Sequence, residues 1–153
     1  MAIRKTNQAE TDYILRLSGN VVQESTAGYA PNHGWNSYEM FSTLIKNGAY
    51  YLIDEESRDL RGWILLGRDL SQLTGELTGH LFHLYVFPHH RNKGIAKRLM
   101  QTAMQELYAN GIYTVQLNVF AGNPAKNLYK KLGFRTISTI MEYKLPKFSI
   151  GHM

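Results

Sequence analysis

The stretch HLYVFPHHRNKGIAKRLMQ, residues 83–101, decides the fold class, because within it a strand gives way to a helix. Residues 80–87 are apolar on both faces apart from two histidines, which is typical of a strand at the centre of a sheet. Pro88 ends this strand, since proline has no N–H to donate to a ladder. From Arg91 onward, apolar residues recur at steps of three and four, which predicts an amphipathic helix.

Strand and helix alternate through the rest of the second half. Gly111 follows the last helical turn as a predicted C′ residue. Residues 113–120 alternate between apolar and polar and predict a strand. Asn123 and Pro124 then predict the N-cap and first residue of a short helix, and residues 134–145 predict one or two closing strands. A helical crossover between two strands makes them a parallel pair.

The first half predicts two helices and a hairpin ahead of the central strand. Its elements are, in order, a short strand at 2–6, a helix at 10–23, a loop at 26–37, a helix capped by Ser37 that ends at Lys46, and a hairpin of strands 49–55 and 60–68 with its turn at 55–59. A length of 153 residues suits one domain with a real core. We therefore predict a single α/β domain, residues 1–153, built on a mixed sheet.

The composition narrows the class of protein. Hydrophobic residues make up 44% of the chain and charged residues 19%, which favours a soluble globular domain over a disordered one. No apolar run reaches the roughly 18 residues of a membrane span, and the first residues lack the apolar core of a secretory signal. We expect a cytoplasmic protein without a membrane partner. The chain has no cysteine, which excludes disulfides, thiolate nucleophiles and cysteine–zinc sites.

Positive charge is concentrated in the second half of the chain. Residues 1–77 hold 7 Lys/Arg and 10 Asp/Glu, a net charge of −3, whereas residues 78–153 hold 10 and 2, a net charge of +8. Such a split gives the second half an electrostatic reason to bind an anion. Nucleic acid is one such anion, but the cations cluster at two helix starts rather than among exposed aromatics. That arrangement favours a compact phosphate ligand.

The turn at residues 91–96 has the features of a phosphate site. The first N–H groups of the helix have no intrahelical partner, and together with the helix dipole they attract anions. Gly94 lets a ligand approach the backbone. Arg91, Lys93 and Lys97 place cations where acidic side chains are normally favoured, and such conflicts mark functional sites. The residues alone leave a solvated basic turn as the alternative, and no P-loop or dinucleotide motif is present.

Two motifs together point to a known family. The turn RNKGIA, residues 91–96, follows a buried strand that ends in V-x-P, and NPAKNLYKKLGF, residues 123–134, comes one strand later. In this order they closely resemble the GNAT superfamily of N-acetyltransferases, whose cosubstrate is acetyl-CoA. The motif-bearing part covers residues 81–145. The resemblance implies a mixed, mostly antiparallel sheet with helices on both faces, and an acetyl-CoA cleft where the parallel strands at 84–86 and 117–119 splay apart.

The resemblance also assigns roles to residues. The strand before the turn offers its backbone to the pantetheine arm, and one of its N–H groups polarises the thioester carbonyl. The amides of the turn hold the pyrophosphate. The residues implied in cofactor binding are Leu84, Tyr85, Val86, Arg91, Asn92, Lys93, Gly94, Ile95, Ala96 and Asn123. Tyr129 matches the tyrosine that protonates the departing CoA thiolate, and a core tyrosine with a satisfied hydroxyl is the alternative.

The sequence departs from the family pattern in its asparagine. Asn123 lies six residues before Tyr129, one fewer than in the common pattern. It therefore either contacts CoA or only caps its helix.

The general base also departs from the pattern. Asn118 stands on the strand where many members place a glutamate, and an amide cannot take a proton from the amine. His80, His83, Glu76 or water is left for that role. The two histidines are three residues apart and are expected on opposite faces of their strand, so no metal site is predicted. The pair at residues 89–90 is expected to be solvated.

The resemblance implies a primary amine, on a small molecule or a peptide, as acceptor. Residues 29–41 are rich in aromatics and form either a pocket wall or core plus a surface loop. Without cysteine, direct attack in a ternary complex replaces any cysteine acyl-enzyme route. Two alternatives from other classes are a nucleic-acid-binding module and a catalytically idle CoA-binding domain. Dimers are frequent in the family, so a homodimer is compatible with the resemblance.

Overall fold

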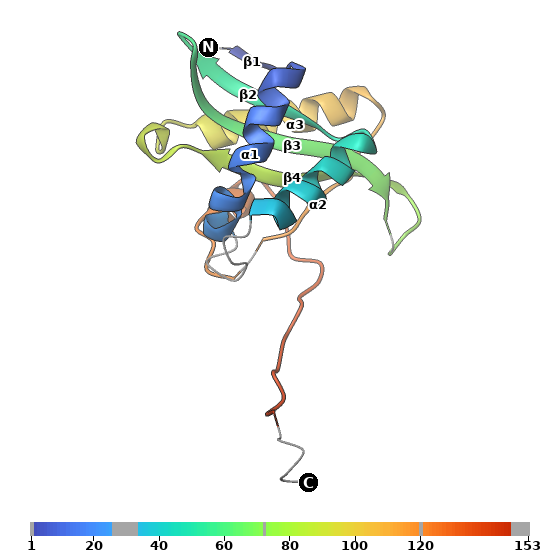
Figure 1. Cartoon of the computed structure of the whole chain (residues 1–153). Coiled ribbons are helices and arrows are strands. Elements are labelled where there is room, and N and C mark those ends of the chain that lie inside the picture. The colour runs from blue at the N-terminus through green and yellow to red at the C-terminus, as the bar shows by residue number, and fades with distance from the viewer. Residues whose placement is uncertain (1, 26–33, 72, 120, 148–153) are drawn as a thin grey trace.

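A five-stranded sheet with strand order β1-β2-β3-β4-β5 forms the centre of the protein (Figure 1). The computed structural model describes residues 2–25, 34–71, 73–119 and 121–147. The strands are β1 (Ala2–Lys5), β2 (Tyr50–Glu56), β3 (Asp59–Leu70), β4 (Leu77–Val86) and β5 (Val115–Leu117). The first four pair antiparallel, and β5 pairs parallel to β4. The predicted mixed, mostly antiparallel sheet with one parallel pair is therefore confirmed.

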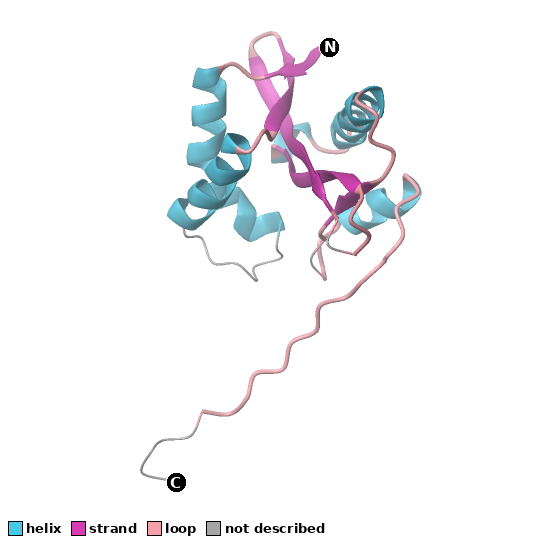
Figure 2. Cartoon of the chain, turned by 90° about the vertical axis from the view of Figure 1, so that its right-hand side faces the viewer, coloured by secondary structure: helices cyan, strands magenta, loops and turns pink. Residues whose placement is uncertain are grey.

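Helices cover both faces of this sheet (Figure 2). They are α1 (Gln8–Ser25), α2 (Gly34–Lys46), α3 (Ile95–Ala109) and α4 (Ala125–Lys131), with a 3-10 turn η1 (Pro88–His90) after β4. Side chains alternate along β2 and β3, so Leu52 and Ile64 join a core with α3, whereas Ile53 and Trp63 join a core with α1 and α2. In the described ranges, no helix is long and apolar enough to cross a membrane.

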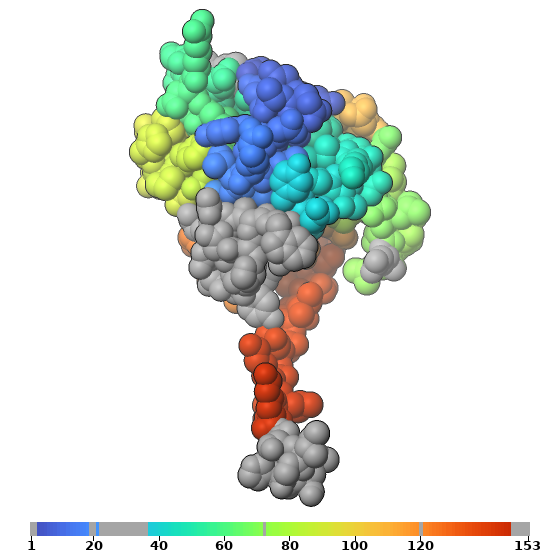
Figure 3. Space-filling model, in the orientation of Figure 1, coloured from blue at the N-terminus to red at the C-terminus, as the bar shows by residue number. Residues whose placement is uncertain are grey.

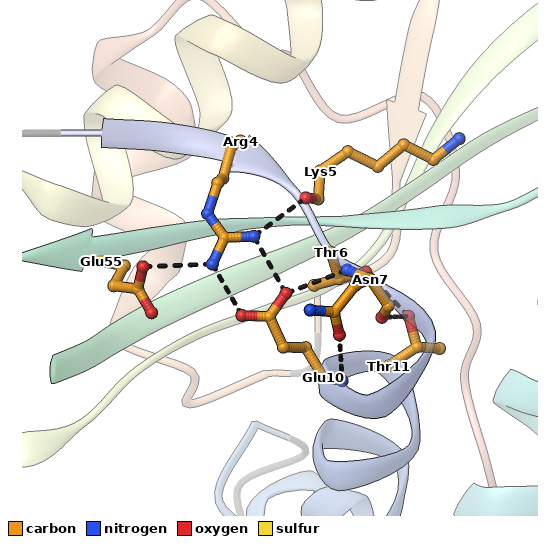
Figure 4. A network of polar contacts seen from close by, with 7 residues as sticks. All are labelled: Arg4, Lys5, Thr6, Asn7, Glu10, Thr11 and Glu55. Carbon is orange, nitrogen blue, oxygen red and sulfur yellow. Dashed lines mark hydrogen bonds and ion pairs between the residues drawn. The ribbon is translucent and has the colours of Figure 1, made fainter. Parts of the chain in front are cut away.

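A polar network ties the start of α1 to the sheet (Figure 4). The Asn7 side chain accepts a hydrogen bond from the Glu10 N–H at 2.8 Å, and the Glu10 carboxylate accepts one from the Asn7 N–H at 2.9 Å. This reciprocal pattern is a capping box, which sets the start of the helix. Arg4 on β1 bridges Glu10 and Glu55 of β2, at 2.7 and 3.1 Å. The hydrogen bond from Arg4 and the one from the Asn7 backbone lower the pKa of Glu10 to about 2.

Two predicted helix starts are wrong by about one helical turn. α2 begins at Gly34, so Ser37 lies buried within its first turns and is not the cap, and residues 26–33 of the predicted loop fall outside the described residues. α3 begins at Ile95 and not at Arg91, because Asn92 and Gly94 have φ values of 64° and 79°. A backbone in the left-handed region cannot belong to a right-handed helix.

The hairpin and the end of α3 follow the predictions. β2 and β3 pair antiparallel, and their turn passes through Ser57 and Arg58, which have φ values of 51° and 66°. Two successive residues with positive φ match the twist of a tight hairpin. At the other end of α3, Asn110 is the C-cap and Gly111 follows with φ 80°. The left-handed conformation explains the glycine at this C′ position.

The predicted strands after residue 112 are shorter or absent. β5 spans three residues where residues 113–120 were predicted as a strand, and Phe120 lies outside the described residues. No strand forms in residues 134–147, against the prediction of closing strands at 134–145. This segment extends away from the sheet (Figures 1 and 3). A strand requires a neighbour for its backbone groups, and this segment lies apart from the sheet.

Candidate active site

The two parallel strands part at the carboxyl end of the sheet. β4 pairs with β5 only from Gly79 to Leu81, opposite Val115 to Leu117. β5 ends there, while β4 continues to Val86 and keeps its pairing with β3. The last part of β4 therefore has an edge that β5 does not cover, in the region where the family resemblance implied a cleft.

A β-bulge in β4 lies where the two strands part. Leu65 of β3 pairs with His83, but the next residue, Leu66, pairs with Leu81. Phe82 is therefore an extra residue in β4 with no counterpart in β3. Such a bulge shifts by one residue which backbone groups face each edge of the strand.

Two hydrogen bonds show the effect of this shift. The Gly79 N–H donates to the carbonyl of Thr114, the residue before β5. The Phe87 N–H donates to the carbonyl of Arg61, which lies on β3. In an unbroken strand, residues an even number apart face the same edge, so the bulge has reversed the pattern between them. By this reasoning the N–H groups of Leu84 and Val86 face the edge that β5 has left, and the N–H of Tyr85 faces β3. Two of the three strand residues predicted to bind pantetheine thus have backbone donors on the open edge.

The loop after η1 presents the uncapped N-terminus of α3. No side chain caps the helix behind Gly94, and its first helical bond runs from the Arg98 N–H to the Gly94 carbonyl at 3.1 Å. The N–H groups of Ile95, Ala96 and Lys97 therefore have no acceptor within the helix. Together with the helix dipole, these donors suit an anion, and the binding of an anion at this turn stays a prediction.

Arg91 connects this loop to the end of β4. Its Nε donates to the Val86 carbonyl at 2.7 Å, and its guanidinium lies over the Tyr85 ring, 5.3 Å from the centroid. Both contacts fix the last residues of β4 relative to the loop. Arg91 therefore holds the loop and the end of β4 in a fixed relative position.

Arg98 connects the loop to a buried residue of the sheet. The Arg98 Nη1 donates to the Lys93 carbonyl at 3.1 Å, and its Nη2 lies 3.9 Å from the Asp54 carboxylate. Asp54 is fully buried and also accepts a hydrogen bond from the Arg61 Nε at 2.6 Å. Asp54 could not be predicted as part of the site, because an acidic residue near a hairpin turn is normally exposed.

Tyr129 lies on α4, on the same face of the sheet as α3. Its ring packs against the apolar cluster that includes Leu84, Val86 and Ile95, and lies 6.2 Å from the Phe134 ring. Burial raises the pKa of the Tyr129 hydroxyl above its ordinary value. The phenol therefore stays protonated at neutral pH, as a proton donor must.

Asn123 lies just before α4, and its Oδ1 accepts a hydrogen bond from the Ala125 N–H at 2.9 Å. The helix begins at Ala125, one residue later than predicted, so Pro124 and not Asn123 stands at the N-cap position. The Asn123 side chain still provides an acceptor for the first N–H of the helix, as a capping side chain does. A contact between Asn123 and CoA stays a prediction.

Residues 18–134 match the acetyltransferase (GNAT) family. The chain belongs to this family. It is 32% identical, over 92% of its length, to a mycothiol acetyltransferase of Corynebacterium jeikeium, and spans only 38% of that protein. It is 28% identical to an N-alpha-acetyltransferase of Sulfurisphaera tokodaii, again over 92% of its length, and spans 84% of that relative.

Solved structures share the fold. A putative acetyl transferase from Pyrococcus furiosus superposes with a TM-score of 0.81 at 19% identity, covering 94% of this chain and 99% of that one. A predicted acetyltransferase from Clostridium acetobutylicum, solved with acetyl-CoA, superposes with a TM-score of 0.73 at 18% identity, covering 94% and 95%. At these identities the likeness shows the GNAT fold alone.

In this GNAT domain the two histidines of β4 lie on one face, which corrects the prediction of opposite faces. The His83 ring stacks on Phe41 of α2 at 5.2 Å, and the His80 ring stacks on Phe82 at 5.6 Å. Phe41 and Phe82 pack in the same core, between the sheet and α1 with α2. The extra residue of the bulge shifts the alternation by one, so residues three apart share a face.

His83 is a buried core residue and a weak base. Its side chain is almost fully buried, and the Trp63 Nε1 donates to its Nδ1 at 3.2 Å. Burial lowers its pKa to about 4. A base with this pKa is poorly matched to an alkylammonium with a pKa near 10.

The buried His83 also predicts that acid destabilises the protein. Below about pH 6.5 the unfolded chain binds a proton at this histidine that the folded state excludes until about pH 4. We expect the free energy of unfolding to fall by up to about 3 kcal/mol between these pH values through this group. Urea titrations at several pH values measure the slope. In His83→Asn, which keeps an acceptor for Trp63, this part of the slope should vanish, and an unchanged slope would refute the assignment.

Two other predictions about titratable groups change. Glu76 is exposed and precedes β4, so about 30 Å of strand separates it from Val86 and it is remote from the open edge. His90 is not solvated, because its Nε2 lies 2.9 Å from the Asp59 carboxylate and its side chain is 12% exposed. Asp59, His89 and His90 also bring three possible ligand atoms within 4.8 Å of one another, so the absence of a metal stays a prediction.

Proposed function

We propose that residues 1–153 form a single GNAT domain that transfers the acetyl group of acetyl-CoA to a primary amine by direct attack. One observation carries the proposal: the open edge of β4 runs directly into the uncapped, glycine-containing N-terminus of α3. An extended chain that ends in phosphates needs these two kinds of donor in this order. Acetyl-CoA has that form.

The open edge of β4 suits the thioester end of the cosubstrate. The N–H groups of Leu84 and Val86 are proposed to bind the pantetheine arm and to donate to the thioester oxygen. Such fixed donors stabilise the negative charge that this oxygen gains during attack. The Tyr85 N–H faces β3, so in this proposal Tyr85 contributes through its ring under Arg91.

The N-terminus of α3 suits the pyrophosphate. The amides of residues 92–96 are proposed to surround it, and the exposed side chains of Lys93 and Lys97 add positive charge. Gly94 leaves room for the oxygens, since a Cβ there would meet only the flexible end of Arg98, at 3.3 Å. Arg91 supports the pyrophosphate indirectly, because its Nε is already engaged with Val86.

The transfer itself requires one proton donor. The amine nitrogen forms a bond to the acetyl carbon, and the carbon–sulfur bond breaks with its electrons on sulfur. In the proposal the Tyr129 hydroxyl gives its proton to that sulfur and regains one from the attacking amine through solvent. The raised pKa of Tyr129 keeps the hydroxyl protonated before transfer.

We assign deprotonation of the incoming ammonium to water. The three side chains considered for this role do not suit it. His83 has too low a pKa, Glu76 lies at the far end of β4, and His80 lies where β4 is still paired with β5. In this proposal, water at the open edge of β4 takes the proton of the ammonium, so no side chain has to act as the base.

Relatives support an amine as the acceptor. One relative, 28% identical, is named an N-alpha-acetyltransferase. A panel of peptides with free N-termini, polyamines and amino sugars, incubated with acetyl-CoA and resolved by mass spectrometry, tests this class. An N-acetylated product supports the proposal. Binding of CoA without any acetylated amine favours an idle CoA-binding domain.

The anion site predicts a specific loss of affinity in Gly94→Ala. The φ of 79° strains any L-residue by about 1 kcal/mol, and the added methyl group stands in front of the helix amides. We expect the Kd for acetyl-CoA, measured by calorimetry, to rise about tenfold or more.

Gly111→Ala is the matched control. Gly111 has φ 80°, lies at the other end of the same helix, and has open space where the Cβ would be. It should lose similar stability and keep its affinity for acetyl-CoA. Equal affinities in the two variants would remove the α3 N-terminus from the binding site.

A further inference from the structure

One carboxylate and two histidines form a cluster beside the turn that follows β4. Asp59, His89 and His90 each offer one ligand atom, and the three atoms lie within 4.8 Å of one another. The proposed acetyl transfer uses none of these side chains. The expectation of no metal rested on the lack of cysteine and on the placement of His80 and His83. Neither argument applies to this cluster.

The backbone brings the two halves of the cluster together. Asp59 is the first residue of β3, directly after the tight turn of the hairpin, and β3 pairs with the end of β4. The residues that follow β4 therefore lie beside the start of β3. The Phe87 N–H donates to the Arg61 carbonyl at 3.0 Å, and the His90 N–H donates to the Phe87 carbonyl at 2.9 Å and closes η1. These bonds hold the histidine turn against the hairpin.

The ring nitrogens of His90 are buried without hydrogen bonds. The Nε2 lies 2.9 Å from an Asp59 carboxylate oxygen but outside hydrogen-bond geometry, and the Nδ1 has no hydrogen-bond partner in the described ranges. Buried polar atoms without a partner are uncommon, and a bound ion is one physical reason for them. Two ligand atoms at about 2.1 Å from a tetrahedral ion lie about 3.4 Å apart. The His90 nitrogen and the Asp59 oxygen are already close to this separation.

The other two side chains are free enough to complete the coordination. His89 is exposed, and its ring centroid lies 4.1 Å from that of His90, so a rotation of one exposed ring brings its nitrogen to the ion. The Asp59 side chain is 59% exposed. The cation on the same strand, Arg61, is already paired with two other carboxylates at 2.6 and 2.9 Å. Its charge is therefore compensated, and Asp59 is left to the histidines.

We propose that Asp59, His89 and His90 bind one divalent first-row metal ion of the Zn²⁺ type. Imidazole and carboxylate groups suit Zn²⁺, whereas Ca²⁺ and Mg²⁺ prefer sites built from oxygens alone. Three protein ligands leave one position of a tetrahedral ion for water. The bound ion ties the β2–β3 hairpin to η1, whose next residue is Arg91 of the α3 loop. The inference does not depend on acetyl transfer.

Calorimetric titration of the metal-free full chain with Zn²⁺ tests the site. Wild type should bind an ion at this cluster with a stoichiometry of one per chain. Asp59→Asn should raise the Kd for Zn²⁺ about 100-fold or more, because losing even a partner outside the coordination sphere typically costs 10- to 100-fold. Asp69→Asn is the matched control, an exposed carboxylate at the other end of β3, and should leave the Kd unchanged. No binding by wild type, or equal Kd values for the two variants, would overturn the proposal.

NMR spectra of the histidine ring nitrogens locate the ion. Addition of Zn²⁺ should shift the ring-nitrogen signals of His89 and His90 and leave those of His80 and His83 in place. In His89→Asn, the Zn²⁺-dependent shift at His90 should need a much higher concentration of the ion. Shifts confined to other histidines would place the ion elsewhere and contradict the proposal.

Discussion

Replacing Tyr129 with phenylalanine is expected to lower kcat by about 100-fold or more, because general acid catalysis typically contributes 10²- to 10⁴-fold. The ring would still pack against the apolar cluster, so the fold should not change. The Kd for acetyl-CoA should stay within about threefold, since the hydroxyl acts on the leaving thiolate rather than on the bound cosubstrate. Steady-state kinetics with a productive amine and calorimetry with acetyl-CoA measure the two effects separately.

Tyr108→Phe is the control for this variant. Tyr108 is 69% exposed on α3, far along the helix from its N-terminus, and loss of its hydroxyl should change neither kcat nor Kd. Turnover of Tyr129→Phe equal to wild type would remove Tyr129 from the mechanism and leave it as a core aromatic.

Arg61→Met should destabilise the protein by about 3–5 kcal/mol, because it leaves the Asp54 carboxylate buried without its main partner. The Asp54 side chain has no exposed surface, and the Arg61 Nε lies 2.6 Å from it. The remaining cation, Arg98, lies 3.9 Å away and also holds the Lys93 carbonyl. Urea denaturation at neutral pH measures the loss in the free energy of unfolding.

Two further variants identify the cause of this loss. Glu56→Gln removes the outer partner of Arg61, which is 55% exposed, and should cost less than about 1 kcal/mol. Arg61→Met together with Asp54→Leu removes both charges and should recover most of the stability. If the double variant is as unstable as Arg61→Met, lost packing rather than an unpaired carboxylate explains the effect.

The sequence predicted most of the fold because its elements have clear periods. The hairpin followed from two apolar runs around a polar turn, and the β4–α3 unit from a change of period next to Pro88. The start of α3 was misplaced because Asn92 adopts a positive φ, which its identity permits but does not require. No sequence pattern indicates the bulge at Phe82, so it could not be predicted that His80 and His83 share a face of the strand.

The sequence predicted only the part of the candidate site that is formed by backbone N–H groups. A motif of the form R-x-x-G-x-A specifies where the chain exposes amides, and the uncapped turn of α3 lies there. The supports of the site were not predicted, because they depend on long-range contacts. Asp54 meets Arg98 only after β2 and α3 pack on one another, and Arg91 reaches Val86 only across η1. Local sequence patterns do not indicate which residues far apart in the chain will come into contact.

The closing strands show the opposite error. The alternation in residues 134–145 predicts a strand, but in the structure residues 134–147 lie outside the sheet. The alternation shows that one face of the segment is apolar. It does not show which strand, if any, pairs with the segment.

Amine-dependent release of the CoA thiol tests the central claim most directly. Purified protein is incubated with acetyl-CoA, with and without a productive amine, while free thiol and N-acetylated product are followed in the same sample. The account predicts one thiol released for each amide formed, dependence on the amine, and no acetylated protein in acetyl-CoA alone. Thiol release that needs no amine, or an amide that forms equally fast without the protein, would contradict it.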